Sequence, residues 1–421
     1  MPTSESARNG QVEPKARNGL VFKKKWRGNN EGTRLARAIA RTYSCGARCS
    51  IWPDVDAEQA IAFHAQHCAD APPGLLLVFA AAATDPHALA AALARQFPET
   101  PHIACSTAGE IGPDGYAEGS IVCISLPADG FNVATLAIEN LSSVEFADIA
   151  QRVERFRRDE AAAPVAGFET SEAFALTFID GLSRREEVFI SAIHRALDGV
   201  PVLGGSTGDD LDFQRTWCVS EGRVLTDAGV LALVRSKHQF SAFRHDNFEP
   251  TDVRLVVTDC DQDERRVLEL NAAPAAREYA ACIGVDASAL DSMSFASHPV
   301  VVKVGGEYYC RSIGHANDDG SLTFFCAMDT GVVLTMSRSL HLVDSARDAF
   351  RSVVGGLGGA DFVLGFDCAL RRLDAENRQM KRELSDVYRE FGVVGFNTFG
   401  EQYGAMHLNQ TFTGLAIGGR T

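Results

Sequence analysis

The stretch HIACSTAGE, residues 102–110, is an apolar run that ends in a hydroxyl residue, a spacer, a glycine and a carboxylate. The same ending closes VLGGSTGD at 202–209 and VGFNTFGE at 394–401. Each copy follows an earlier apolar run and a helix-like stretch, and these earlier runs are Leu75–Phe79, Phe174–Ile179 and Phe362–Phe366. A strand–helix–strand unit that is written several times indicates a repeated fold. Three polar turns are therefore expected at equivalent places, where a site is favoured.

The segments around these copies predict an α/β fold with mixed sheets. Helices are expected at Asp85–Gln96, with Asp85 as N-cap, and at Ser183–Leu197, where Ser183 and Glu186 match a capping box. A strand follows each copy, at 119–126, 229–234 and 410–417, and residues 209–218 also read as extended. Strands that pair after the motif favour mixed sheets over purely parallel ones.

The segment after Cys368 has the most regular helical pattern in the chain. Its stripe, spaced by three and four, consists of Leu370, Leu373, Asn377, Met380, Leu384, Val387 and Phe391. We expect one helix packed on the sheet, with a coiled-coil seam as the alternative.

Length and composition favour two domains and exclude a nucleic-acid surface. The chain has 421 residues, 46% hydrophobic content and a net charge of −15. We expect a disordered basic arm at 1–30, a first domain at 31–270 and a second at 271–421. The N-terminus carries charges but no apolar core of a secretory signal, and no apolar run is long enough to cross a membrane. The eleven cysteines stand singly, which favours a reducing, cytoplasmic setting.

The chain carries several short motifs in a specific order and spacing, which are residues 105–111, Asn247–Pro250, Val267–Asn271 with Pro274 and Tyr279, and Gly400–Gly404 with His407 and Asn409–Thr411. In this set of motifs it resembles the FIST proteins, bacterial sensory modules with a FIST N and a FIST C domain. The resemblance covers about residues 40–420. Residues 320–329 and 366–372 are closer to the NosP-type branch, which binds haem and senses nitric oxide. This branch implies a partner, a histidine kinase or a cyclic-di-GMP enzyme.

If haem binds, it needs an axial ligand in an apolar pocket, and no C-x-x-C-H motif is present for covalent attachment. His407, His315 and His298 are the candidate ligands, and the alternative for His407 is a core histidine that bonds a backbone carbonyl. Arg371 and Arg372 follow a strand end and would suit a haem propionate. Their alternative is a salt bridge to Asp374 or Glu376 at the start of the helix.

The repeated turns offer candidate ligand contacts, which are Ser206, Thr207, Asp209, Asp367, Asn397, Thr398 and Glu401. The carboxylates Glu110, Asp209 and Glu401 would equally accept backbone N–H groups and hold each turn in shape. Residues 204–208 match the G-x-S-x-G nucleophile elbow, but that motif requires a helix directly after the serine. A hydrolase at Ser206 is therefore the weakest interpretation.

Cys45, Cys49, His64, His67 and Cys68 are ligand types that zinc uses. His64 and Cys68 fall on one face of a helix expected at 57–69. The spacing matches no common zinc motif, so we expect buried thiols beside surface imidazoles and no metal.

We therefore predict a non-catalytic cytoplasmic sensor that binds a small ligand and signals by contact with its partner. The sharper hypothesis is haem b with nitric oxide as the signal, which would shift the population of a partner-binding conformation. A haem-free module for an amino acid or another metabolite is the alternative. A homo-oligomer is compatible with the sequence.

Overall fold

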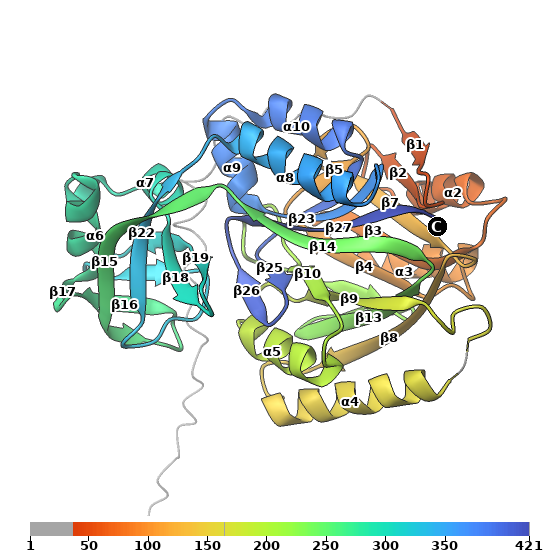
Figure 1. Cartoon of the computed structure of the whole chain (residues 1–421), viewed down its shortest axis with the longest axis horizontal. Coiled ribbons are helices and arrows are strands. Elements are labelled where there is room, and N and C mark those ends of the chain that lie inside the picture. Colours follow the sequence, from red (N-terminus) through yellow and green to blue (C-terminus); the bar gives the residue numbers. More distant parts are fainter. Residues whose placement is uncertain (1–36, 164, 421) are drawn as a thin grey trace, which may run out of the picture.

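The computed structural model describes residues 37–163 and 165–420, so the basic arm predicted at 1–30 lies outside it. Residues 37–247 and 340–420 form one body, and residues 248–339 form a smaller inserted domain beside it (Figure 1). Within the described part of the chain, no helix has the length and apolar character needed to cross a bilayer. The predicted boundary of the family domains after residue 270 stays a prediction.

The body contains three mixed sheets, which confirms the predicted fold class. Each holds one parallel pair, namely β3–β4, β9–β10 or β23–β24, with antiparallel neighbours. The first sheet has the order β1 (Ile39–Thr42), β2 (Arg48–Trp52), β7 (Ile121–Pro127), β3 (Pro73–Ala81), β4 (His102–Thr107), β11 (Cys218–Ser220), β12 (Arg223–Leu225). The second has β26 (Met406–Leu408), β25 (Glu401–Tyr403), β10 (Val202–Ser206), β9 (Glu172–Ile179), β13 (Ala228–Ser236), β8 (Phe131–Glu139). The third has β14 (His238–Asp246), β27 (Thr411–Arg420), β23 (Phe362–Cys368), β24 (Val393–Thr398), β5 (Glu110–Gly112), β6 (Gly115–Ala117).

The inner faces of the three sheets share one core. Phe79 of the first sheet stacks at 4.6 Å between ring centroids on Phe396 of the third, and Phe178 of the second contacts Phe366 at 6.0 Å. Helices cover the outer faces, as the amphipathic patterns predicted. They are α2 (Ala57–His67) and α3 (Pro86–Gln96) on the first sheet, α4 (Phe146–Ala162) and α5 (Glu186–Leu197) on the second, and α8 (Leu342–Gly356), α9 (Ala369–Asn377) and α10 (Lys381–Glu390) on the third.

Each repeated turn sends its chain into a different sheet. After the first copy, hairpin β5–β6 pairs with β24 of the third sheet. After the third copy, hairpin β25–β26 pairs with β10 of the second sheet, and after the second copy, β11–β12 pairs with β4 of the first. The three units therefore exchange hairpins in a closed cycle.

The turns meet at the centre of the body and bond to one another through their backbones. The N–H of Ala108 donates to the carbonyl of Asn397 at 2.9 Å, and the N–H of Asn397 donates to Gly109 at 2.7 Å. Gly208 donates to the carbonyl of Ser106 at 3.1 Å, and Ser206 donates to that of Gly400 at 2.7 Å.

Glycines are required where these turns cross. Gly109 has a φ of +134°, and a Cβ at Gly208 would lie 2.9 Å from both the nitrogen and the Cβ of Ala108. The glycines of the first two motifs are therefore explained by close approach between the turns, whereas Gly400 of the third is crowded by His407 of the hairpin that follows it.

Two of the three motif carboxylates do the same structural task. Glu110 accepts from the hydroxyl of Thr107 and from Ser120, and Glu401 accepts from the hydroxyl of Thr398 and from Thr411. Each carboxylate thus joins its own turn to the residue ten positions later, where the exchanged hairpin ends. The second copy departs from this pattern, because Asp209 accepts from three backbone N–H groups of residues 213–215 in its own loop.

Three local predictions were wrong in detail. Helix α5 begins at Glu186 without a capping box, because the Glu186 carboxylate meets Arg265 of the inserted domain at 2.8 Å. The long helix after Cys368 is divided into α9 and α10 by Gln379, which has a left-handed φ of 59°. Residues 209–217 form a loop, and only 218–220 are a strand.

The inserted domain is one twisted antiparallel sheet with short helices. Its strand order is β19 (Glu307–Arg311), β18 (Val300–Val304), β22 (Val333–Ser339), β15 (Phe248–Asp261), β16 (Arg266–Leu270), β21 (Leu322–Phe324), β20 (Ile313–Ala316), with β17 (Ala273–Pro274) beside β16. Its helices are α6 (Ala275–Ile283), the 3-10 turn η1 (Ala287–Ala289) and α7 (Ser292–Ser297).

The motif carboxylates predict a pH-dependent stability. Burial raises the pKa of Glu401 to about 8 and that of Glu110 to about 7. An unfolded glutamate loses its proton near pH ~4.3, so between about pH 5 and 8 these two folded carboxyl groups keep protons that the unfolded chain has lost. Their contribution to the free energy of unfolding therefore falls as pH rises through this window and levels off above it. The buried His64 and His245, whose pKa values burial lowers to about 3, contribute with the opposite sign below about pH 6.5.

Replacing Glu401 with glutamine removes one of the two titrating groups. We expect the slope of the free energy of unfolding against pH to be less negative in Glu401→Gln than in wild type between pH 5 and 8, measured by urea unfolding. Glu99→Gln at an exposed position is the matched control and keeps the wild-type slope. Equal slopes for wild type and Glu401→Gln would contradict the assignment.

Candidate functional site

The inserted domain is joined to the body by two chain crossings that lie side by side. One crossing is Asn247, between β14 and β15, and the other is Leu340, after β22. The N–H of Leu340 donates to the carbonyl of Asn247 at 2.7 Å, and Phe248 pairs with Ser339. We call residues 247 and 340 the hinge, because the chain passes between the body and the inserted domain there.

The hinge is held by a buried ion pair of the body. Nη1 of Arg371 donates to Oδ1 of Asn247 at 2.9 Å, and its Nε donates to Oδ1 of Asp367 at 2.8 Å. The other oxygen of Asp367 accepts from the hydroxyls of Tyr116 and, at 3.0 Å, of Tyr388. A buried ion pair needs such additional hydrogen bonds to offset its desolvation. The strand β23 and helix α9 thereby fix the position of the hinge.

Asn397 completes this network from the next strand. Its Nδ2 donates to Asp367 at 3.3 Å, whereas its buried Oδ1 has no hydrogen-bond partner among the described residues. Nη1 of Arg372 packs against Gly109, and its nearest carboxylates, Glu376 and Glu118, are 3.7 and 3.8 Å away. The expected salt bridge of Arg372 to Glu376 is thus present as a long contact, while the ligand roles of Asp367, Asn397, Arg371 and Arg372 stay predictions.

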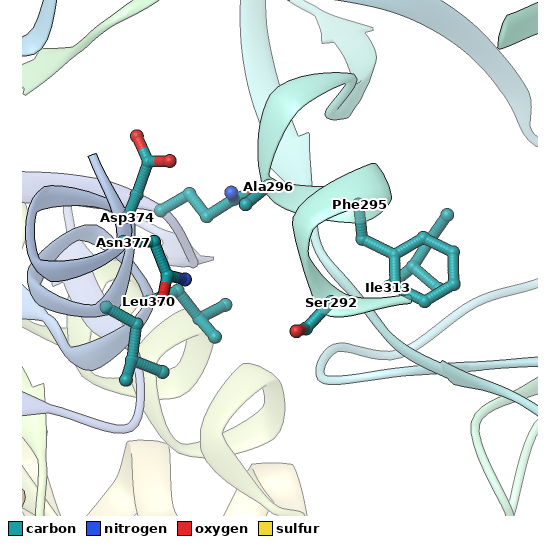
Figure 2. Close-up of a pocket in the computed structure, with 9 residues that line it drawn as sticks. Ser292, Phe295, Ala296, Ile313, Leu370, Asp374 and Asn377 are labelled. Atoms are coloured by element: carbon teal, nitrogen blue, oxygen red, sulfur yellow. The ribbon is translucent and has the colours of Figure 1, made fainter. Parts of the chain in front are cut away.

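A narrow cleft separates α7 of the inserted domain from α9 of the body (Figure 2). Its walls are mostly apolar, with two amides, a carboxylate and a hydroxyl at the edges, and its volume is about 10 Å³. That volume is close to what one water molecule needs. The lining residues are Ser292, Phe295, Ala296 and Ile313 on one side and Leu370, Leu373, Asp374, Asn377 and Gln410 on the other.

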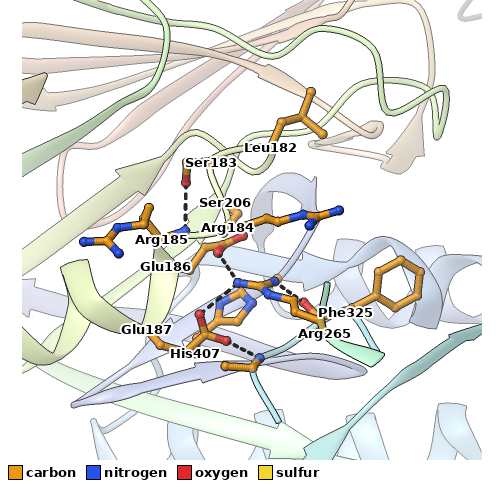
Figure 3. Close-up of polar contacts among 12 residues, drawn as sticks. Leu182, Ser183, Arg184, Arg185, Glu186, Glu187, Ser206, Arg265, Phe325 and His407 are labelled. Carbon is orange, nitrogen blue, oxygen red and sulfur yellow. Dashed lines mark hydrogen bonds and ion pairs between the residues drawn. The ribbon is translucent and has the colours of Figure 1, made fainter. Parts of the chain in front are cut away.

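A second contact between the inserted domain and the body is a cluster of charges, Arg265 with Glu186 and Glu187, which we call the clamp (Figure 3). Nη2 of Arg265, in the inserted domain, lies 2.8 Å from Glu186 and 3.0 Å from Glu187, both in the first turn of α5. Its Nη1 donates to the carbonyl of Phe325 at 2.6 Å, and the N–H of Ala327 donates to Glu187 at 2.7 Å. Burial alone would raise the pKa of Glu187, but His407 and Arg265 hold it below its usual value.

His407 lies beside this clamp, on the exchanged hairpin β25–β26 (Figure 3). Burial lowers its pKa, and its Nε2 has no hydrogen-bond partner among the described residues. The same holds for Oε1 of Gln402 and Oδ1 of Asn409, both fully buried. Buried polar atoms without a partner are rare, and each calls for a water, an ion or a ligand. The hairpin therefore presents unsatisfied polar atoms close to the interface.

The other two candidate histidines belong to the inserted domain. His315 lies on β20, two residues after Ile313 of the cleft wall. His298 follows α7, and its Nδ1 lies 3.2 Å from the carbonyl of Ser294. The three predicted ligands are thus spread over both parts of the molecule, on either side of the interface.

The residues of the second turn face the interior. Ser206 is fully buried, and its Oγ accepts from Nε2 of Gln402 at 2.9 Å. Thr207 accepts from the N–H of Gly181 at 3.2 Å. No helix follows Ser206 within the described segment that leads to β11, so the strand–turn–helix geometry of a nucleophile elbow is missing.

The residues that hold the interface carry little signal in the sequence. Arg265 lies in a polar turn between two strands, and Glu186 matches a capping box that does not form. Asn247 stands out only as part of the Asn247–Pro250 motif. Their pairing depends on the placement of a domain inserted between distant segments, which local patterns do not encode.

Comparison with known proteins identifies two families of domain in this chain. The FIST N domain matches residues 74–273 and the FIST C domain matches residues 275–404. A protein of Methanocaldococcus jannaschii that is described as uncharacterised is 26% identical over 181 residues. That match covers 42% of this chain and 34% of the relative, so the chain spans about a third of the length of the curated relative it matches.

Removing the clamp cation should destabilise the protein strongly. Arg265→Ala would leave two carboxylates in a buried interface without their cation, and we expect the free energy of unfolding to fall by about 3–5 kcal/mol. Arg266→Ala is the matched control, because Arg266 pairs with Asp319 at a more exposed position and should cost about 1 kcal/mol or less. Urea unfolding measures both. Equal losses for the two variants would contradict the clamp.

Proposed function

The chain belongs to the FIST proteins, with a FIST N domain followed by a FIST C domain, and from this we propose that it senses a small ligand at the cleft between body and inserted domain. The domains imply a sensory role in signal transduction. The observation that carries the choice of site is that Gln402, His407 and Asn409 each keep one buried polar atom without a partner among the described residues, while Gln410, next to them in the chain, lines a cleft between both parts. We further propose a cytoplasmic setting, consistent with eleven free thiols.

Helix α9 offers a route by which a ligand would act on the hinge. Leu370 and Asn377 of α9 line the cleft, and Arg371 of the same helix holds Asn247. A ligand that widens the cleft would have to displace α7 from α9, and with it the inserted domain. A ligand shifts such an equilibrium only by its difference in affinity for the two positions. The signal would then be the position of the inserted domain.

The first ligand class that we propose is a free amino acid or a metabolite of similar size. The cleft has apolar walls from Phe295 and Leu373 and polar groups from Asn377, Asp374 and Gln410 at its edges. This combination suits a small molecule with one apolar part and hydrogen-bonding ends. The partner that reads the signal is, on this proposal, a histidine kinase or a cyclic-di-GMP enzyme.

A thermal-shift assay tests the cleft. Each of the common free amino acids, added singly to the full chain, is screened for an increase in Tm, and a ligand at 100 times its Kd would add about 2.7 kcal/mol of stability. Ala296→Phe fills the cleft and should abolish the increase. Ala289→Phe, at an exposed position of the same domain, is the control and should retain it. An increase that survives Ala296→Phe would place the ligand elsewhere, and no increase with any amino acid would exclude this ligand class.

The narrower proposal is haem with nitric oxide as the signal, and the described arrangement fits it only in part. The Nε2 of His407 is the kind of atom that binds haem iron, and haem would supply the nitric oxide-binding metal. However, the cleft volume of about 10 Å³ is far below the several hundred cubic ångströms that such a ligand occupies. A Cβ at Gly400 would lie 2.2 Å from Cε1 of His407, so the ring is already closely packed. Haem would therefore require an opened interface.

Absorption spectroscopy tests the haem proposal. Protein reconstituted with haem should show a stoichiometric Soret band that moves on addition of nitric oxide. His407→Ala should weaken or shift this band, with His315→Ala and His298→Ala as the matched comparisons. The absence of a stoichiometric band in wild type would exclude haem while leaving the amino-acid proposal intact.

A further inference from the structure

The fold separates the zinc-type ligands near the N-terminal end into two groups. Cys45 and Cys49 are buried in the core shared by the three sheets, whereas His64 and Cys68 lie on the outer face of the first sheet, on and just after α2. His64 is fully buried, so the surface imidazole expected at this position is wrong. Within the part of the chain that the structure describes, no group of three or more His, Cys, Asp or Glu side chains is placed to hold a metal ion.

A buried cation next to the central turns lacks a close partner. Only 6% of Arg372, in the first turn of α9, is exposed, and its buried Nε has no hydrogen-bond partner among the described residues. The nearest carboxylate oxygens, Oε1 of Glu376 and Oε1 of Glu118, are 3.7 and 3.8 Å away, beyond hydrogen-bond distance.

Lys381 explains why these two carboxylates do not bond to Arg372. Its Nζ donates to Oε1 of Glu118 at 2.5 Å and to Oε1 of Glu376 at 2.8 Å, and these are the same oxygens that lie nearest to the guanidinium. A guanidinium carries several N–H donors, and burying it without hydrogen bonds is costly. Arg372 therefore keeps donors for a further acceptor.

Asn397 brings an acceptor without a partner to the same place. A Cβ at Gly109 would lie 2.1 Å from Nη1 of Arg372 and 3.0 Å from Oδ1 of Asn397, so both atoms border one point of the first turn. Asn397 is fully buried, and its Oδ1 has no hydrogen-bond partner among the described residues. Buried polar atoms of this kind call for a water, an ion or a ligand.

The guanidinium lies directly beneath side chains that reach solvent. Those of Glu118, Glu376 and Lys381, which border it, are 24%, 20% and 25% exposed. The loop after the second turn lies on the same side, because burial raises the pKa of its Asp210 and the charge of Arg372 opposes that shift.

We propose that Arg372 and Asn397 bind a small monocarboxylate that carries a hydroxyl or an ammonium group on the carbon next to its carboxylate. The guanidinium matches a planar carboxylate with two parallel hydrogen bonds, and Oδ1 of Asn397 accepts from the neighbouring hydroxyl or ammonium. The negative charges of Glu118, Glu376 and Asp210 disfavour a doubly charged phosphate. This site is separate from the cleft and does not rest on the function proposed there.

The loop at 209–215 connects this site to the inserted domain. Asp210 lies near Arg372, so a bound carboxylate changes the surroundings of the loop. Three residues later, the ring of Phe213 stacks on Phe399 of the third turn at 4.7 Å between centroids and on Phe325 of the inserted domain at 6.2 Å. The loop is therefore the segment in which binding is best observed.

Isothermal titration calorimetry of the full chain tests the site with glycolate and glycine, and with acetate and inorganic phosphate as comparisons. We expect glycolate, glycine or both to bind, and acetate, which lacks the second donor, to bind about threefold to tenfold more weakly. Absence of binding by both glycolate and glycine would overturn the proposal. So would phosphate that binds more tightly than either of them.

Substitutions then locate the bound carboxylate. Arg372→Gln should weaken binding at least about tenfold, and Arg372→Lys, which keeps the charge without the fork, should weaken it too. Arg382→Gln, at an exposed position of α10, is the matched control and should bind as wild type. Ala296→Phe, which fills the cleft, should also leave this binding unchanged, so failure of the cleft and failure of this site are told apart.

Hydrogen–deuterium exchange keeps the test decisive if Arg372→Gln does not fold. The bound ligand should slow exchange at residues 209–215 and leave α7, at the cleft, unchanged. Slower exchange in α7 alone, loss of binding in Ala296→Phe, or unchanged affinity in a folded Arg372 variant would each place the ligand elsewhere and overturn the proposal.

Discussion

The backbone hydrogen bonds among the three central turns are the constraint on which the rest of the molecule depends. Each turn uses its own N–H and carbonyl groups on another turn, as where Asn397 donates its N–H to the carbonyl of Gly109 and accepts from the N–H of Ala108. Buried backbone groups must be paired, and here no single unit can pair its own. Glycines are needed where the turns approach one another closely. The carboxylates of Glu110 and Glu401 accept from residues that follow the exchanged hairpins, and so tie each turn to the chain after its hairpin.

The repeated sequence predicted the three units correctly, because a strand–helix–strand unit is encoded locally by apolar runs, caps and glycines. Asp85 caps its helix as expected, accepting from the N–H of His87 at 2.9 Å. The exchange of hairpins was not predicted, since a strand of three residues such as Glu401–Tyr403 carries no information about the sheet it will join. The ion pair of Glu186 with Arg265 was not predicted either. Its cation belongs to the domain that is inserted between two strands of the body.

At the end of β23, the sequence predicted a cluster of polar residues but not the partners of Arg371. The strand end at Asp367 is a place where polar groups gather, as expected for an open sheet. Arg371, however, turns back to Asp367 and reaches Asn247, 124 positions earlier, instead of Asp374. His407 was selected because it follows the third turn, and it does lie at the interface. What places it there is the register of β25 against β10, which sequence periodicity does not fix.

The closed cycle of hairpins also bears on how this chain can be divided. The second sheet belongs mainly to the FIST N part, yet its edge is completed by β25–β26, and the third sheet combines β23, β24 and β27 from the C-terminal part with β14, β5 and β6 from the FIST N part. A chain cut between residues 273 and 275 would leave the edges of β10 and β24 bare and expose half of a shared apolar core. Exposed edges of this kind template aggregation. The two parts recognised by sequence are therefore not separate units of folding, because each completes a sheet of the other.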